Sequence, residues 1–148
     1  MSTNSKPYAY LAGKMSGLSY QRSIAWRKQL AEMLEPAFTV LSPMRGQAKI
    51  GFEDACAGAC NSGFELTRDI TDIERSDVIV ARFGLNEPVS FGTGVELGTC
   101  IPLRKPVVFV FEPGDNLLQH PFVKSFPRGI LTYSLEEASD YLYSMFDI

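Results

Sequence analysis

One stretch of the chain has residue types and spacing suited to chemistry at the start of a helix: Ser90-Phe91-Gly92-Thr93-Gly94-Val95-Glu96-Leu97-Gly98. An apolar run at 77–81, typical of a strand, precedes it. Its glycines permit a tight turn and a close approach of the backbone to a ligand. Glu96 is expected in the first helical turn, where the macrodipole and free N–H groups favour an ionised carboxylate. That carboxylate could act as a nucleophile or stabilise a developing cation, or simply be an exposed helix-start charge.

The glycines of this stretch do not form a dinucleotide-binding motif. Gly92, Gly94 and Gly98 are spaced G-x-G-x-x-x-G, one residue longer than the motif requires. The acidic residue also lies inside the loop and helix, whereas the motif places it about 20 residues further on. Because a carboxylate at this place would repel a pyrophosphate, the sequence excludes an ordinary Rossmann site.

A second glycine turn follows the first predicted strand, at 7–12. Gly13-Lys14-Met15-Ser16-Gly17 contains a lysine and a serine. A loop of this kind at the carboxyl end of a strand can hold a phosphate or a sugar hydroxyl. A plain connection between strand and helix is the alternative interpretation.

Two further charged residues lie beside predicted core elements. Arg45 follows the predicted strand 39–41, and its planar guanidinium could bind a phosphate or carboxylate, or remain a solvated loop charge. Asp69 precedes Ile70, a core position of the predicted helix 65–75, and is therefore expected at the edge of a cleft. The apolar positions of that helix expected to face the core are Leu66, Ile70 and Ile73.

Strands alternate with helices along the whole chain. The predicted strands are 7–12, 39–41, 77–81, 105–111 and 130–133, and the main predicted helices are 20–34, 65–75, 135–146 and the one after Ser90. Segments 42–63 and 112–126 are expected to be irregular. The alternation predicts an α/β fold, a doubly wound five-stranded parallel sheet with the flavodoxin-like order 2-1-3-4-5. The residues expected to converge at the carboxyl ends of its first and third strands are Tyr10, Gly13, Ser90, Thr93 and Glu96.

Length and composition describe a single globular domain. The 148 residues are 45% hydrophobic and 21% charged, with a net charge of −3, which is ordinary for a globular protein and unfavourable for non-specific nucleic-acid binding. No apolar run approaches the roughly 18 residues of a membrane span. Residues 1–6 are polar, lack the apolar core of a signal peptide and are expected to be disordered, followed by one domain at 7–148. The expected compartment is the cytoplasm.

The cysteines and the histidine give no framework for a disulfide or a metal. Cys56, Cys60 and Cys100 are an odd number of cysteines, which indicates reduced thiols. A metal site would need more ligands than these and the single histidine, His120, so neither a metal nor a cofactor is expected. A catalytic pair of a cysteine with His120 stays open, although no local pattern supports it.

Taken in order, the motifs resemble those of the nucleoside 2-deoxyribosyltransferase family. The matching segments are Tyr10-Leu11-Ala12-Gly13, Ser42-Pro43, Arg68-Asp69-Ile70, Ser76-Asp77-Val78-Ile79-Val80-Ala81, Gly92-Thr93-Gly94-Val95-Glu96-Leu97-Gly98 and Lys105-Pro106-Val107-Val108. The segments of Asp69 and Glu96 together are the most specific part. The resemblance implies a five-stranded doubly wound fold and cleavage of the N-glycosidic bond of (deoxy)nucleosides or their 5′-monophosphates.

The resemblance also implies roles for three residues. Glu96 matches the glutamate that attacks the anomeric carbon, Asp69 matches an aspartate that helps to hold the nucleoside and its base, and Tyr10 matches a tyrosine that orients the glutamate. The chemistry is coherent, because departure of the base leaves an oxocarbenium-like sugar that a nearby carboxylate can trap. The sugar then passes to another base or to water, and Asp69 is the available acid for the leaving base.

One position departs from the relatives that act on free nucleosides. Six residues before Glu96 they carry an aspartate, whereas this chain has Ser90, as do relatives that hydrolyse deoxynucleoside 5′-monophosphates and bind the phosphate with it. A hydroxyl can donate a hydrogen bond to a phosphate, whereas a carboxylate would repel it, so the sequence favours nucleotide substrates. His120 is expected from a neighbouring subunit of a homodimer or larger homo-oligomer, because the family builds its site across a dimer interface. Further expected substrate contacts are Gly13, Lys14, Ser16, Arg45, Gly92 and Thr93.

Two other functions stay open from the sequence alone. One is a flavodoxin-like module that holds a nucleotide without chemistry. The other is a glycohydrolase that releases nicotinamide from NAD, because that chemistry also places a carboxylate beside a ribosyl cation. Release of a base from nucleosides, their monophosphates or NAD distinguishes all three.

Overall fold

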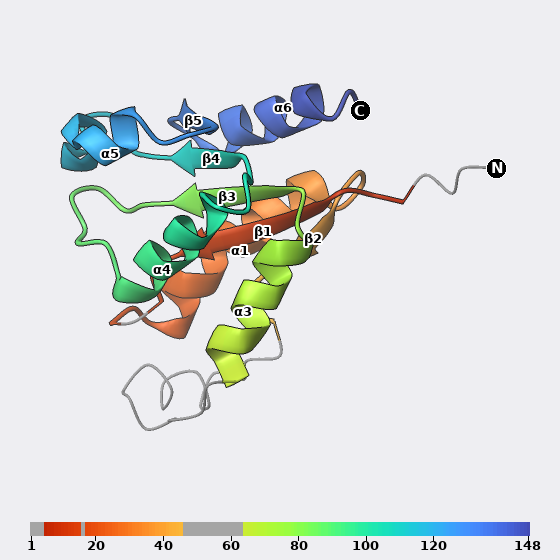
Figure 1. Cartoon of the computed structure of the whole chain (residues 1–148), viewed down its shortest axis with the longest axis horizontal. Helices are drawn as coiled ribbons and strands as arrows, with labels where there is room; N and C mark the ends of the chain where they lie inside the picture. The colour runs from red at the N-terminus through yellow and green to blue at the C-terminus, as the bar shows by residue number, and fades with distance from the viewer. Residues whose placement is uncertain (1–4, 16, 46–63) are drawn as a thin grey trace.

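The computed structural model describes residues 5–15, 17–45 and 64–148, which form one five-stranded parallel sheet with helices on both faces (Figure 1). The predicted order is confirmed: the strands lie side by side as β2-β1-β3-β4-β5. The strands are β1 (Tyr8–Gly13), β2 (Thr39–Leu41), β3 (Val78–Arg82), β4 (Val107–Val110) and β5 (Gly129–Thr132). The helices are α1 (Tyr20–Leu34), α3 (Phe64–Arg75), α4 (Phe91–Cys100), the 3-10 helix η1 (Asn116–Gln119), α5 (Pro121–Lys124) and α6 (Leu135–Met145).

The register of β1 sets the position of the site. β1 pairs with β2 on one side and with β3 on the other. The strands that follow β1 in the sequence are therefore added first on one side of it and then on the other. Gly13, the last residue of β1, lies opposite Arg82, the last residue of β3. In sheets of this kind, ligands bind in the crevice at the carboxyl ends of the strands beside such a change of side. The loops that follow β1 and β3 therefore border the expected crevice.

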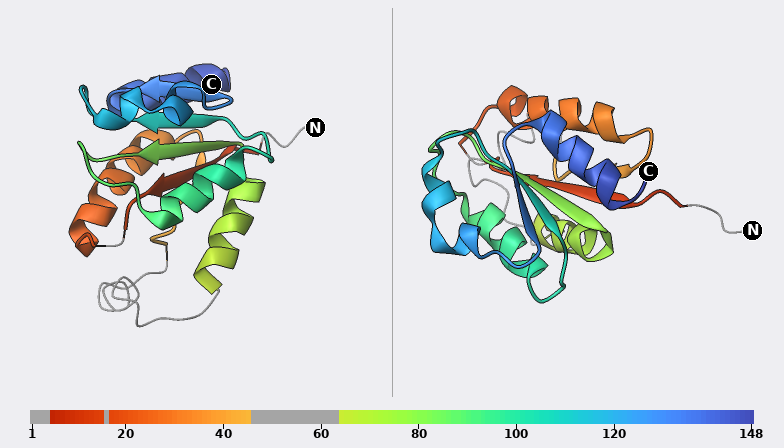
Figure 2. Two further views of the ribbon diagram at one scale, coloured as in Figure 1. Left: turned by 60° about the vertical axis from the view of Figure 1, so that its left-hand side comes forward. Right: turned by 90° about the horizontal axis from the view of Figure 1, so that it is seen from above.

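Two apolar layers hold the helices against the sheet. α1 and α6 cover one face, and α3 and α4 cover the other, as the view from above shows (Figure 2). Alternate residues of β1 divide between the layers: Ala9 and Leu11 pack under α1 and α6, whereas Tyr10 and Ala12 pack under α3 and α4. This period-two alternation places the Tyr10 side chain in the same layer as α4.

Most predicted elements are confirmed within one or two residues, and Ser19 and Ser134 are the N-caps of α1 and α6. Within the segment expected to be irregular, the structure instead forms η1 and α5. The predicted core face of α3 is partly wrong, because Leu66 is 57% exposed while Asp72 is buried.

In the described part of the chain no helix is long and apolar enough to span a membrane. The predicted disordered start falls mostly outside the described residues, as do Cys56 and Cys60.

Candidate active site

The glycine-containing stretch forms α4, and Ser90 is its N-cap. The Ser90 hydroxyl oxygen accepts a hydrogen bond from the Thr93 amide at 3.2 Å and lies 2.8 Å from the Thr93 hydroxyl oxygen. Because Phe91 is the first helical residue, Glu96 stands in the second turn of α4 and not in the first. The expectation that free N–H groups of the first turn keep Glu96 ionised is therefore wrong.

Burial governs the Glu96 carboxyl group. The residue is 9% exposed, and loss of hydration raises its pKa from 4.5 to about 7. Tyr10 and Arg27 oppose this effect, and the negative charge of Asp69 adds to it. At neutral pH the site therefore holds a carboxyl group divided between its acid and its anion, which suits a group that must carry charge during a reaction.

Tyr10 reaches the same site from β1. Burial is the main cause that raises the pKa of its hydroxyl far above the ordinary value, followed by the charge of Glu96, so the hydroxyl keeps its proton. The hydroxyl lowers the pKa of Glu96, yet neither Tyr10 Oη nor Glu96 Oε2 completes a hydrogen bond within the described residues. We infer that the two groups lie near each other without hydrogen-bond geometry, so both atoms are buried with unused hydrogen-bonding capacity.

Asp69 borders the site from α3. Burial raises the pKa of its carboxyl, and the adjacent Arg68 guanidinium opposes this from 3.3 Å. Arg68 also donates to the carbonyl oxygens of Pro43 at 2.7 Å and Arg45 at 3.1 Å. Arg68 thus ties α3 to the loop after β2 and holds Asp69 beside it. The charge of Asp69 raises the pKa values of both Tyr10 and Glu96, and Tyr10 and Glu96 also act on each other, so we treat these three side chains as one electrostatic cluster.

The structure gives Arg45 a protein partner. Its Nη2 atom lies 2.7 Å from Oδ2 of Asp72, and Arg75 lies 2.9 Å from the other carboxylate oxygen. Asp72 is buried, so the two arginines compensate a carboxylate that would otherwise be costly to bury. A substrate phosphate would have to compete with Asp72 for Arg45.

The turn after β1 begins at a glycine that packing requires. A Cβ atom on Gly13 would lie 2.9 Å from Trp26 Cζ2 and 3.2 Å from the carbonyl oxygen of Arg82. Lys14 follows, half-buried, whereas Ser16 lies outside the described residues.

At the start of α4, Gly92 faces open space, where a Cβ atom would meet no atom within 4 Å. Thr93 is buried beside Ser90.

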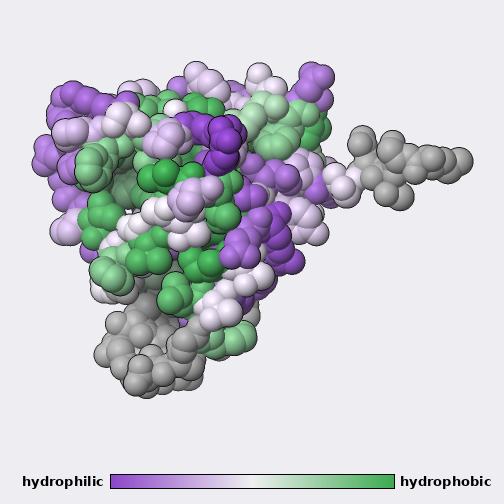
Figure 3. Space-filling view, viewed as in Figure 1, coloured by the Kyte–Doolittle hydropathy of each residue, from purple (hydrophilic) through white to green (hydrophobic). Residues whose placement is uncertain are grey.

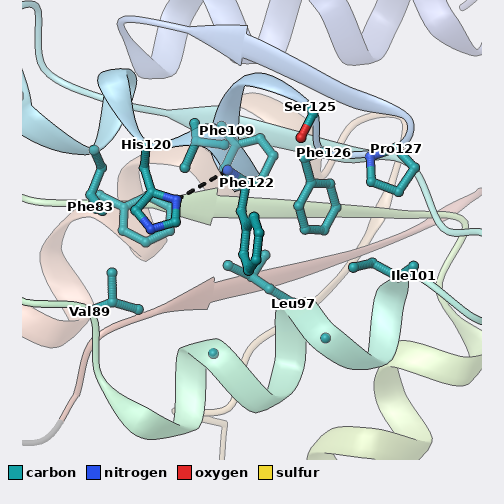
Figure 4. A pocket seen from close by; sticks show the side chains of 14 residues that line it. Phe83, Val89, Leu97, Ile101, Phe109, His120, Phe122, Ser125, Phe126 and Pro127 are labelled. Atoms are coloured by element: carbon teal, nitrogen blue, oxygen red, sulfur yellow. Dashed lines mark hydrogen bonds between the residues drawn. The ribbon is translucent and has the colours of Figure 1, made fainter.

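His120, unlike the residues above, belongs to the segment at the start of α5. It caps α5, with its Nδ1 atom accepting a hydrogen bond from the Phe122 amide at 3.1 Å. It lines an apolar recess of about 570 Å³ between α4 and α5 (Figure 4). The α4 residues of that recess are Gly94, Leu97 and Gly98, and Ile101, the C-cap of α4, lines it too. Glu96 is not among the lining residues, so within one chain the structure does not bring His120 to the cluster.

One residue near the site was missed from the sequence. Arg27 is 2% exposed and donates to the carbonyl oxygens of Leu11, Gly13 and Ser23. The sequence did indicate that Arg27 is buried, because position 27 falls on the apolar face of α1, between buried Ser23 and Leu30. A charged residue at a core position of an amphipathic helix is rarely buried without a specific reason. Across the described residues no group of three or more His, Cys, Asp or Glu could hold a metal ion.

Comparison with known proteins connects this geometry to a family. A curated relative from Mus musculus, 5-hydroxymethyl-dUMP N-hydrolase, is 28% identical over 99 residues, which cover 64% of this chain and 54% of that protein. The chain thus matches about half the length of this relative. Among solved structures, that of BlsM superposes with a TM-score of 0.65 at 19% identity, covering 97% of this chain and 95% of BlsM. CMP N-glycosidase BcmB of Clostridium botulinum gives 0.56 at 17% identity, covering 91% and 97%.

These structural likenesses establish the fold. The family follows from the sequence, because the model of one family matches residues 9–140, from β1 into α6 and across every segment of the cluster. The chain belongs to the nucleoside 2-deoxyribosyltransferase family.

Proposed function

We propose that this protein breaks the N-glycosidic bond of (deoxy)nucleosides or their 5′-monophosphates, with Glu96 as the nucleophile. The observation that supports this most directly is the buried Glu96 carboxyl of α4, which forms one electrostatic cluster with Tyr10 of β1 and Asp69 of α3. The family of the chain and the name of its relative, an N-hydrolase of a nucleotide, support the same reaction class.

The reaction proceeds in two steps. A Glu96 oxygen forms a bond to the anomeric carbon, the carbon–nitrogen bond breaks, and its electron pair leaves with the base, which takes up a proton. Water, or the nitrogen of a second base, then attacks the same carbon, releases the glutamate and gives up a proton. Two displacements retain the configuration of the sugar, as in retaining glycosidases. Water gives a hydrolase, and a second base gives a transferase.

Tyr10 and Asp69 have separate tasks in this scheme. The Tyr10 hydroxyl keeps its proton and orients Glu96 as a hydrogen-bond donor once the substrate has closed the site. Asp69 holds the base, and burial raises its pKa, which favours the protonated acid that the leaving base needs. Arg68 limits that rise and fixes the direction of the carboxyl.

The proposed phosphate contacts lie at the start of α4 and in the turn after β1. Ser90 and Thr93 offer hydroxyls at the start of α4, and Gly92 leaves space beside them. Lys14, and Ser16 by its place in the sequence, are proposed as further contacts, and Arg45 would join only after release from Asp72. The nucleotide in the name of the relative supports a monophosphate substrate.

Replacing Ser90 tests the phosphate contact. Ser90→Asp should lower kcat/KM for a deoxynucleoside 5′-monophosphate about a hundredfold and change that for the free nucleoside little, because a carboxylate repels the phosphate. Aspartate and asparagine both cap helices, so Ser90→Asn is the matched neutral control with α4 intact. Kinetics with both substrate classes give the ratio. Equal losses for nucleoside and monophosphate would refute the phosphate contact.

We further propose that the active form is a homo-oligomer whose sites are shared between subunits, as expected from the sequence. Hydrophobic side chains gather on the face that carries α4 (Figure 3). Phe91 is 90% exposed at the start of α4, and Phe122 is 77% exposed beside the recess that contains His120. Exposed apolar surface of this kind is typical of protein interfaces. A partner chain would supply His120 to the Glu96 cluster.

Mixing two inactive variants tests the shared site. Glu96→Ala and His120→Ala should each be inactive alone, and co-refolded in equal amounts they should recover about a quarter of the wild-type activity, because half of the dimers carry one intact site. Mixing either variant with itself is the control. No recovery in demonstrably mixed dimers would place His120 and Glu96 of the same chain in one site or remove His120 from it.

A chromatographic screen tests the reaction itself. Nucleosides, their 5′-monophosphates and NAD are incubated with wild-type protein or with Glu96→Ala, with and without a second base. We expect wild type to release a base from deoxynucleotides. A new nucleoside or nucleotide would indicate transfer, whereas free sugar phosphate alone would indicate hydrolysis. Binding without release of a base would favour the module that only holds a nucleotide, and release of nicotinamide from NAD would favour the glycohydrolase.

We also propose a cytoplasmic location for the protein. Nucleotide substrates and the unpaired, buried Cys100 support it.

A further inference from the structure

Arg27 occupies a position that neither its helix nor its hydrogen bonds explain. α1 packs on the sheet face opposite α4, and Arg27 extends from it to the carboxyl end of β1. Its guanidinium donates to the carbonyl oxygens of Ser23 at 2.5 Å, Gly13 at 3.0 Å and Leu11 at 3.4 Å, and lies 4.6 Å from the centre of the Trp26 ring. These are neutral partners for a side chain that is almost fully buried.

A buried cation needs a compensating negative charge. Burial lowers the pKa of Arg27 to about 10, so the group is still positive at neutral pH. No carboxylate of the described residues forms an ion pair with Arg27, while Arg82 nearby repels it. The charge that favours its positive form most is the Glu96 carboxylate, and Arg27 in return lowers the pKa of Glu96. Each ion thus compensates the other across the end of β1.

The contact with Gly13 gives Arg27 a second effect. Gly13 has no side chain, and a Cβ atom there would lie 3.4 Å from Arg27 Nη2, so the guanidinium approaches the backbone where the turn toward Lys14 begins. Gly13 also lies opposite Arg82 at the end of β3. A guanidinium that holds two carbonyl oxygens of β1 fixes the direction in which the chain leaves the sheet.

We propose that Arg27 is a positioning residue for the reaction at Glu96: its buried guanidinium holds the end of β1 beside the substrate and supplies the positive charge that balances the Glu96 carboxylate. This inference rests on the proposed function for its kinetic consequences, but the charge balance itself exists without substrate. The other titratable groups facing Glu96 are Tyr10 from β1, Asp69 from α3 and Cys100 from α4 itself. Arg27 is the cation among them.

The kinetic test compares three variants. Arg27→Met should lower kcat/KM at pH 7 at least about tenfold and move the acidic limb of the pH profile about one pH unit higher, because Glu96 loses its balancing cation. Arg27→Lys keeps the charge and should keep the limb in place, even with a lower kcat. Lys28→Met removes a charge from the exposed neighbour on α1 and should change neither quantity. A limb that stays in place in Arg27→Met overturns the proposal.

A stability cycle tests the charge balance without any turnover. The folded-to-unfolded ratio is measured by denaturation for wild type, Arg27→Met, Glu96→Gln and the double variant, with the neutral Arg27→Gln replacing Arg27→Met if the latter does not fold. We expect the two substitutions to be coupled at least about tenfold at pH 8, where Glu96 is ionised, and less than about twofold at pH 5, where it is neutral. Simple additivity at both pH values overturns the proposal even if Glu96 proves catalytic. Coupling without base release supports it and refutes only the proposed function.

Discussion

Glu96→Gln should abolish base release and leave the substrate bound. We expect kcat/KM to fall by about 10⁴-fold, because an amide can neither attack the anomeric carbon nor balance the positive charge that develops there. The amide has the shape of the protonated carboxyl, so the buried site should keep its packing. Quantifying the free base by chromatography gives the rate, and calorimetric titration with the nucleotide gives the affinity. A variant that retains a tenth of the activity would contradict a nucleophilic role.

The same substitution should also stabilise the protein at alkaline pH. Burial raises the folded-state pKa of Glu96 from 4.5 to about 7, so the folded protein keeps a proton that the unfolded chain releases between these values. Stability is therefore lost as the pH rises through this interval, and above it the ionised carboxylate costs roughly 3 kcal/mol. Glutamine carries no such cost. Denaturation should show the variant more stable than wild type at pH 8 and nearly equal near pH 4. A constant difference at both values would mean that Glu96 titrates normally.

Tyr10→Phe should have the next largest effect and should change the pH profile. Activity requires the ionised form of Glu96, so wild-type kcat/KM should rise through about pH 7. The tyrosine hydroxyl lowers the pKa of Glu96, and without it burial is less opposed, so the rise should move to higher pH. We expect a loss of about a hundredfold at pH 8, as for removal of one donor from a preorganised site, and a larger loss at pH 6.

The matched control for this prediction is Tyr133→Phe, which removes a hydroxyl from an exposed tyrosine next to α6. It should leave the rate and the profile unchanged. Steady-state kinetics between pH 5.5 and 9 would provide the comparison. Parallel profiles for wild type and Tyr10→Phe, differing by the same factor at every pH, would mean that the hydroxyl does not act on Glu96.

The fold was predictable because local signals and connection rules agreed. Ser19 and Pro36 bracket α1, and short apolar runs marked the strands, so the alternation and the right-handed crossover rule left the order 2-1-3-4-5 as the natural choice. That order alone places the loops after β1 and β3 side by side. The meeting of Tyr10 and Glu96 then follows from the alternation of side chains along β1.

What the sequence did not reveal concerns burial of charge. The helix-dipole rule applied to Glu96 assumed a first-turn position and contact with water, and the structure provides neither. Apolar periodicity in α3 assigned only Leu66, Ile70 and Ile73 to the core, whereas Asp72 is buried as well and Arg45 and Arg75 compensate its charge. The position of Arg27 on the apolar face of α1 indicated that it is buried, but its hydrogen-bond partners are carbonyl oxygens that no sequence pattern displays. Such networks depend on loops that meet only in three dimensions.

Capture of the covalent intermediate tests the central claim most directly. Wild-type protein is mixed with a deoxynucleoside 5′-monophosphate, quenched in acid within one turnover, and examined by intact mass and by peptide mapping. We predict a mass increase equal to that of the sugar phosphate less one water, located on the peptide that contains Glu96 and absent from Glu96→Gln. Attachment of the sugar to any other residue, or base release whose first product has the opposite anomeric configuration, would contradict the account.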